Sequence, residues 1–260
     1  TIVEARKLAE LARQYDVVTQ VGNQGHATEG TRQTVEWIQS GLIGLVREVQ
    51  LSTNRPIWPQ GNVRRPAGVP VPTTLNYDVW LGPAPLKPYH PDCTHFNSAD
   101  YLPQASVITY EFAARGYLPA VTVTWRDGGL RPPRPEALEP GRAIRDATYY
   151  GDKGIIMHAS HGAVPELVPA DPAFKGVDPW LPRTGDIYED WIAAIRNGKK
   201  SCNDFSVASK VTEIMLLTNI ALLNKSANVT LEYDAANMKI TNLEAANTLF
   251  HYEYRQGWSL

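Results

Sequence analysis

Apolar residues near the start of the chain recur at the spacing of an amphipathic helix, three or four positions apart over residues 1–15. A β-branched run over residues 17–22 follows and predicts a short strand that is covered on both faces. The two patterns then repeat, as a helix over residues 28–40 and a strand over residues 46–53. Helices alternating with strands in this way are typical of βαβ units, which build a doubly wound sheet.

Residues 54–104 depart from both patterns because proline is frequent there. Proline fixes φ and has no N–H to donate, so we expect irregular chain. The same stretch holds aromatic residues, which a disordered linker normally lacks; they are Trp58, Tyr77, Trp80, Tyr89 and Phe96. We therefore expect an ordered loop, and an ordered loop of this length is usually functional.

Alternating apolar and polar positions return after residue 105 and predict antiparallel strands. The strands are expected over residues 106–112, 120–125, 147–151 and 155–158, the last two forming a hairpin through Asp152-Lys153-Gly154. Helices are expected over residues 185–197 and 206–223, and late strands over 229–233 and 238–241.

These elements predict an α/β region followed by an α+β region. We expect residues 1–53 to be the C-terminal remnant of a dinucleotide-binding Rossmann domain. Residues 54–260 are then a second domain: a Pro-rich ordered loop over 54–104, and an open, largely antiparallel sheet with helices on one face over 105–260. No Gly-rich phosphate loop precedes the first predicted strand, so we expect the rim of a cofactor site without most of that site.

Hydrophobic residues make up 43% of the 260 residues and charged residues 20%, with a net charge of −2. The near-neutral charge gives no electrostatic footprint for nucleic acid or for an anionic membrane. No stretch approaches about 18 consecutive apolar residues. The two cysteines, Cys93 and Cys202, are too few for a disulfide framework. We therefore expect a soluble protein that binds neither nucleic acid nor a membrane.

Several short passages resemble the Gfo/Idh/MocA family of nicotinamide-dependent oxidoreductases, in particular a bacterial branch with the loop Gly22-Asn23-Gln24-Gly25-His26. The other passages are TNRPIWPQG (53–61), WLGPAP (80–85), WIAAIRNGKK (191–200), LLTNIAL (216–222) and YRQGW (254–258). The resemblance implies NAD or NADP as cofactor and hydride transfer at a carbinol carbon of a sugar, cyclitol or glycoside. It also implies that residues 54–260 are a substrate and oligomerisation domain, which forms a homo-oligomer through the open sheet. The protein is then expected to be bacterial and to lie in the cytoplasm or periplasm.

Two groups of residues are candidates for ligand contact, because they leave predicted strands at what should be one edge of the sheet. The resemblance places Asn23, Gln24 and His26 near the nicotinamide or a sugar hydroxyl; the alternative is that they only satisfy hydrogen bonds of their turn. Asn54, Arg55 and Trp58 are expected to contact the substrate, with packing among prolines as the alternative for Trp58.

Other groups of polar residues give weaker indications. His90, Asp92, Cys93 and His95 fall within six residues and have the chemistry of metal ligands. The chain offers no matching second cluster and Pro91 restricts convergence, so we predict no metal site. Tyr188, Asp190 and Lys210 lie on predicted helices, where they either face the cleft or are solvated surface groups.

The chain departs from the family pattern at its catalytic segments. The Gly-rich loop and the Glu-Lys-Pro motif have no counterpart in these residues, nor does the Gly-Asp…His motif expected after Asp100. Proton transfer from an alcohol needs a positioned acceptor, and the family's Lys and His have no matching position here. We therefore expect an oxidoreductase present as an incomplete chain, with no catalytic residue identified. The alternatives are a noncatalytic binding or assembly module and a glycoside-cleaving enzyme that uses transient oxidation.

Overall fold

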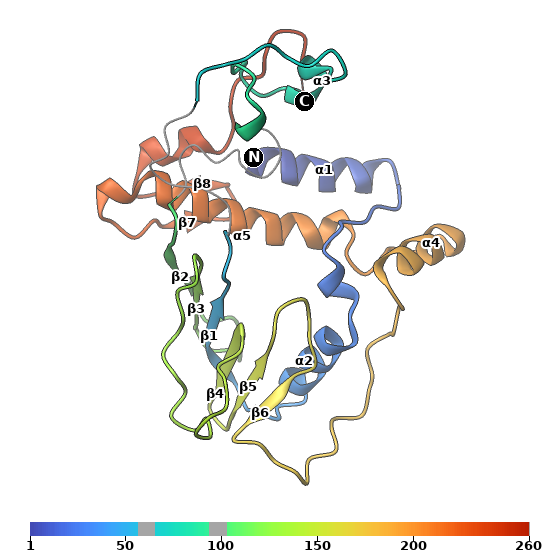
Figure 1. Ribbon diagram of the computed structural model, residues 1–260. Coiled ribbons are helices and arrows are strands. Elements are labelled where there is room, and N and C mark those ends of the chain that lie inside the picture. Colours follow the sequence, from blue (N-terminus) through green and yellow to red (C-terminus); the bar gives the residue numbers. More distant parts are fainter. Residues whose placement is uncertain (57–65, 94–102, 260) are drawn as a thin grey trace. The chain divides into compact units, whose positions relative to one another are not determined.

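The computed structural model describes residues 1–56, 66–93 and 103–259, which divide into two compact units (Figure 1). Unit 1 consists of Thr1–Val17, Trp58–Gln104 and Phe205–Leu260, and unit 2 of Val18–Ile57 and Ala105–Asp204.

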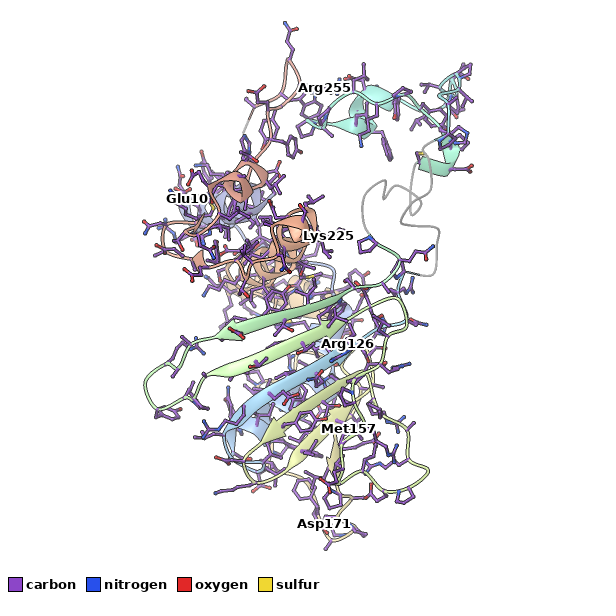
Figure 2. The ribbon with its side chains drawn as sticks, turned by 90° about the vertical axis from the view of Figure 1, so that its left-hand side faces the viewer. Glu10, Arg126, Met157, Asp171, Lys225 and Arg255 are labelled. Carbon is purple, nitrogen blue, oxygen red and sulfur yellow. The ribbon has the colours of Figure 1, made fainter. Side chains whose placement is uncertain are left out.

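Unit 2 is built on an open sheet with six strands in the part of the chain that the structure describes. Their order is β2 (Val107–Phe112), β3 (Val121–Arg126), β1 (Val46–Ser52), β4 (Ala147–Gly151), β5 (Ile155–His158) and β6 (Glu166–Val168). Only β1 and β3 run parallel; the other neighbouring pairs are antiparallel. Figure 2 shows the strands side by side, with Arg126 on β3 and Met157 on β5. The predicted open, largely antiparallel sheet is confirmed.

Helix α2 (Glu29–Gln39) packs on this sheet through its C-terminal half. Trp37 joins Ile43 and Ile156 in a buried cluster with half-buried side chains of β1, β4 and β6. A second cluster joins Leu138 to Met157 and Val168. Since Ile156 and its neighbour Met157 project to opposite faces of β5, both faces of the sheet are covered at this end. That packing fixes the position of α2 and therefore of its first turn, which lies beyond the packed half.

The strand expected over residues 17–22 is a wrong prediction, because this segment pairs with side chains rather than with a neighbouring strand. The Val18 carbonyl accepts from the indole N–H of Trp191 (3.3 Å), and the Thr19 carbonyl accepts from the Ser201 hydroxyl (2.6 Å). The Val21 N–H donates to the backbone carbonyl of Asn203 (3.1 Å). A β-branched run satisfies its backbone equally well with such partners, and the sequence pattern does not distinguish the two cases.

The strand expected over residues 46–53 is confirmed as β1, but it lies in the middle of the largely antiparallel sheet, with Val49 opposite Val123 of β3 and Tyr149 of β4. The predicted domain boundary after residue 53 therefore does not coincide with the division into compact units. The assignment of residues 1–53 to a dinucleotide-binding domain stays a prediction.

Unit 1 packs helix α1 (Ile2–Gln14) against helix α5 (Phe205–Leu223). Its core is a cluster of Ile2, Ile220, Ile240, Ala246 and Phe250, next to the small hairpin of β7 (Tyr233–Asp234) and β8 (Lys239–Ile240). The predicted helices over 1–15 and 206–223 are confirmed. By length and composition alone, α5 is also apolar enough to cross a membrane.

A close backbone contact joins α2 to the turn after β5. A Cβ atom at Gly30 would overlap the backbone carbonyl oxygens of Gly162 and Ala163. The hydroxyl of Thr28, which caps α2, lies within hydrogen-bond distance of the carbonyls of Gly25 (2.9 Å) and Gly162 (2.8 Å) and can donate to either. The missing side chain at position 30 thus lets the first turn of α2 and the loop before it rest directly on the sheet's connecting turn.

We expect Gly30→Ala to destabilise the protein by about 1–3 kcal/mol, because the added methyl group forces the backbone apart. Gly22→Ala is the matched control, since a Cβ there meets nothing within 4 Å. Urea unfolding followed by circular dichroism measures both. Equal midpoints for the two variants would contradict the close packing of α2 on this turn.

Candidate functional site

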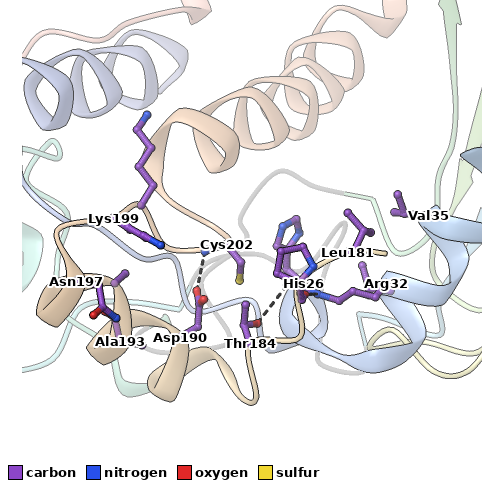
Figure 3. Close-up of a pocket in the computed structure, with 14 residues that line it drawn as sticks. His26, Arg32, Val35, Leu181, Thr184, Asp190, Ala193, Asn197, Lys199 and Cys202 are labelled. Atoms are coloured by element: carbon purple, nitrogen blue, oxygen red, sulfur yellow. Dashed lines mark hydrogen bonds between the residues drawn. The ribbon is translucent and has the colours of Figure 1, made fainter. Parts of the chain in front are cut away.

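A cavity of about 550 Å³ in unit 2 is the candidate site (Figure 3). It is walled by the first turns of α2, the segment 181–184, helix α4 (Ile187–Asn197) and the residues that follow α4. The lining residues are His26, Thr31, Arg32, Val35, Leu181, Pro182, Thr184, Asp190, Ala193, Ala194, Asn197, Lys199, Lys200 and Cys202. A volume of this size fits a small ligand, and the wall combines apolar surface with a few polar groups, as binding sites commonly do.

The side chain of Arg32 lies buried in this wall and is 8% exposed. Its guanidinium donates to the carbonyl of Pro182 (3.2 Å), to the hydroxyl of Thr184 (3.2 Å) and to the carbonyl of His26. These three acceptors belong to two segments, the loop before α2 and residues 182–184. Arg32 therefore ties the loop that carries His26 to the segment 182–184.

The carboxylate of Asp190 is also buried, at 8% exposure. It accepts a hydrogen bond from the Cys202 N–H (2.6 Å), which Figure 3 marks with a dashed line. The Cys202 thiol is in hydrogen-bond contact with both Asp190 and Arg32; burial, with Asp190 adding to it, raises the pKa of the thiol. A neutral thiol thus lies between the buried carboxylate of Asp190 and the buried guanidinium of Arg32.

Glu36 fixes the segment that forms the outer wall. Its carboxylate is 1% exposed and accepts from the backbone N–H groups of Trp180 and Leu181 (both 2.8 Å). The Arg183 guanidinium donates to both of its oxygens (2.5 and 2.8 Å) and also pairs with Glu29. Hydrogen bonds from Arg183 and from the two N–H groups outweigh burial and lower the pKa of Glu36 from its ordinary 4.5 to about 2.

The end of α4 places two lysines at the rim. Gly198 ends the helix in the left-handed conformation (φ 59°), which glycine adopts without a steric penalty. The chain then turns into Lys199 and Lys200, both exposed and both lining the cavity. Ser201, which follows, donates to the Thr19 carbonyl and so holds this turn to the segment 18–21.

Of the first predicted group, the structure brings His26 into the cavity. Asn23 and Gln24 are exposed on the same loop, in or next to the short helix η1 (Gln24–Ala27), and do not line it. The Asn23 side chain instead accepts a hydrogen bond from Asn203. Cofactor contact by these three residues stays a prediction.

The second predicted group lies elsewhere. Asn54 and Arg55 are exposed just after β1, where the Arg55 carbonyl accepts from Gly128 N–H, and neither lines the cavity. Trp58 lies outside the described residues. Substrate contact by these residues also stays a prediction.

No cluster of three or more metal-ligating side chains gathers within residues 1–56, 66–93 and 103–259. His90 faces Asp92 at 3.7 Å, and Cys93 is buried. His95 lies outside the described residues.

Sequence analysis missed most of the cavity, including Arg32, Thr184 and Lys199. A signal was present in α2, where Arg32 and Glu36 are spaced four apart on one helix face. Their partners lie about 150 positions away along the chain, so no local pattern identifies them.

Comparison with known proteins gives one family match. Residues 31–104 match the Gfo/Idh/MocA model described as an oxidoreductase family, C-terminal alpha/beta domain. The matched residues begin in α2 and include β1. The match supports the resemblance seen in the sequence. No curated protein matches the chain significantly.

Three solved structures show a distant likeness. A candidate oxidoreductase from Klebsiella pneumoniae is 14% identical with a TM-score of 0.43, over 96% of this chain and 70% of its own. An NAD-binding protein from Listeria innocua is 10% identical with a TM-score of 0.40, and the match covers 82% of this chain and 67% of that protein. A dehydrogenase from Chromobacterium violaceum is 14% identical with a TM-score of 0.38, and the match covers 88% of this chain and 70% of that protein. Scores this low carry no inference about function.

We expect Glu36→Gln to lower stability by about 2–3 kcal/mol at neutral pH, because Arg183 loses its buried partner. The low pKa of Glu36 stabilises the fold fully above pH 4.5, and this contribution is lost as the pH falls from 4.5 toward 2. The variant should therefore lose part of the acid-induced decrease in stability that the natural protein shows over that range.

The matched control is Glu136→Gln, which removes an exposed carboxylate of the same unit. Urea unfolding at several pH values between 7 and 2 measures both variants. Parallel stability curves for the two would show that Glu36 does not hold the wall as an anion.

Proposed function

We propose that this chain carries the substrate-binding part of an NAD- or NADP-dependent oxidoreductase of the Gfo/Idh/MocA type. The proposed reaction oxidises a carbinol carbon of a sugar, cyclitol or glycoside by hydride transfer. The observation that carries the proposal is the match of residues 31–104 to the family's C-terminal domain. The ordered passages that resemble the family elsewhere in the chain support it.

The chemistry of the cavity suits a polyol. Apolar groups that can pack on the C–H faces of a sugar come from Val35, Leu181, Pro182, Ala193 and Ala194. Hydroxyl groups of the ligand can pair with Thr184 and Asn197, and the carboxylate of Asp190 can accept from them. Both kinds of surface come from helices and from a segment held by Glu36, so the cavity is preformed.

The described residues do not fit the pyrophosphate of a dinucleotide. Such a cradle needs glycine backbone open to the phosphates at the start of a helix. A Cβ at Gly25 would meet the backbone of His161 at 3.1–3.3 Å, so the space beside Gly25 is already filled. The N–H groups of His26 and Thr28 are bonded to Asn23 and Gly25 carbonyls. The cofactor therefore enters the proposal through the family match alone.

The reaction also needs a group that accepts the proton of the alcohol. We assign this role to His26, which lines the cavity and whose ring makes no hydrogen bond to any other described residue. Its loop is anchored by Arg32 and by the hydroxyl of Thr31 on the Gly25 carbonyl (2.6 Å).

The test is reduction of NAD⁺ or NADP⁺, followed by nicotinamide fluorescence, with a panel of hexoses, inositols and glycosides. We expect turnover with at least one of them. His26→Asn should lower kcat by about 10²–10⁴-fold, the usual contribution of general base catalysis. The control is His161→Asn, an exposed histidine outside the cavity whose positive φ (60°) asparagine tolerates.

Equal activity of the two variants would contradict the role of His26. The absence of both turnover and dinucleotide binding would contradict the oxidoreductase proposal. That result would favour a noncatalytic binding or assembly module, which is consistent with the missing fit to a pyrophosphate. Release of free sugar without net accumulation of reduced cofactor would favour glycoside cleavage by transient oxidation.

The oligomer implied by the family resemblance would use the open sheet of unit 2. Its edge strand β2 exposes Val107 (53%) and Phe112 (42%), which supports pairing with a second copy.

A further inference from the structure

The cavity beside α2 and α4 carries more basic than acidic groups. Its lining includes Arg32, Lys199, Lys200 and His26, against the single carboxylate of Asp190. Lys200 lies 3.7 Å from Asp204, which offsets its charge in part. Even when His26 is left out, the two positive charges of Arg32 and Lys199 exceed the single negative charge of Asp190.

Arg32 is the basic group whose charge is least compensated. It is 8% exposed, yet its oxygen acceptors are two carbonyls and one hydroxyl, and it forms no ion pair with any described residue. Removing a charge from water is costly unless a counter-charge accompanies it. The Asp190 carboxylate is connected to Arg32 only through the Cys202 thiol and already accepts from the Cys202 N–H.

An anion in the cavity would supply that counter-charge. A guanidinium has five N–H groups, and Arg32 uses three of them on His26, Pro182 and Thr184, with a further contact to the Cys202 thiol. A carboxylate or phosphate oxygen would pair with it by a charge-assisted hydrogen bond, which is roughly twice as strong as a neutral one. Figure 3 shows Arg32 and His26 on one side of the cavity and Asp190 and Asn197 on the other.

We propose that this cavity binds a polyhydroxylated ligand that carries an anionic group, such as a sugar acid or a sugar phosphate. Arg32 binds the anionic group, and Asp190 and Asn197 bind hydroxyl groups at the opposite side, where Lys199 adds a second positive charge that attracts the anion. The sugar part of this inference rests on the proposed function, whereas the anionic part rests on the charges of the cavity alone.

The experiment is calorimetric titration of the whole chain, without any nicotinamide cofactor, with glucuronate, a hexose phosphate and glucose. We expect glucuronate or the hexose phosphate to bind at least about tenfold more tightly than glucose, and the tighter of the two identifies the anionic group. Raising the salt concentration should weaken binding of the charged ligand more than that of glucose.

Lys199→Gln tests the site without disturbing a buried group, because Lys199 is exposed at the rim. We expect it to weaken binding of the charged ligand by about 3–10-fold, the size of a partly exposed charge interaction. Lys175→Gln is the matched control, as an exposed lysine of the same unit outside the cavity, and should leave the affinity unchanged. Arg32→Lys, which keeps the charge but loses the fork of donors, should weaken binding further.

Glucose binding as tightly as both charged ligands would overturn the proposal, and so would the absence of any charged-ligand binding. An equal effect of Lys199→Gln and Lys175→Gln would also overturn it. Because no cofactor is present, the result is separable from the proposed reaction. Anion binding without turnover leaves this site standing, and turnover of a neutral sugar without anion binding removes this inference alone.

Discussion

The carboxylate of Glu36 is the constraint on which the candidate site depends. It is buried on α2, and the next residue, Trp37, packs the helix onto the sheet. From there it binds the Arg183 side chain and two consecutive backbone N–H groups of the segment that contributes Leu181, Pro182 and Thr184 to the cavity. A segment without regular secondary structure thereby acquires a fixed position relative to α2. One turn earlier on the same helix, Arg32 binds that segment again.

The opposite wall, formed by α4 and the residues after it, is held by a different set of hydrogen bonds. The extended segment 18–21 has no neighbouring strand, and side chains from α4 and the residues after it satisfy its backbone instead. These bonds hold the turn that presents Lys199 and Cys202 and the helix that carries Asp190. Buried polar groups whose partners are satisfied rigidify a structure. The cavity is therefore enclosed by polar contacts, and the sheet with α2 provides the base on which they act.

The sequence predicts elements better than it predicts their neighbours. The helices over 28–40 and 206–223 and the hairpin through Asp152-Lys153-Gly154 follow from local patterns, and the structure confirms them. The strand β1 is also found where the sequence predicts it. An alternation of apolar and polar residues does not identify the neighbouring strand, so the parallel pairing of β1 with β3 was not predicted. The segment 17–22 has the composition of a strand and lacks a partner. His26 was predicted from its loop, and Asp190 was among the helix residues that could face the cleft, whereas the place of Arg32 depends on contacts between distant segments.

The central claim is that the cavity of unit 2, and not the carboxyl end of β1, receives the substrate. Backbone amide NMR shifts recorded while a sugar acid is titrated into the protein test it most directly. The account predicts saturable shifts at Arg32, Thr184, Asp190 and Lys199. Shifts confined to Asn54 and Arg55, or no saturable shift at any of these amides, would contradict it.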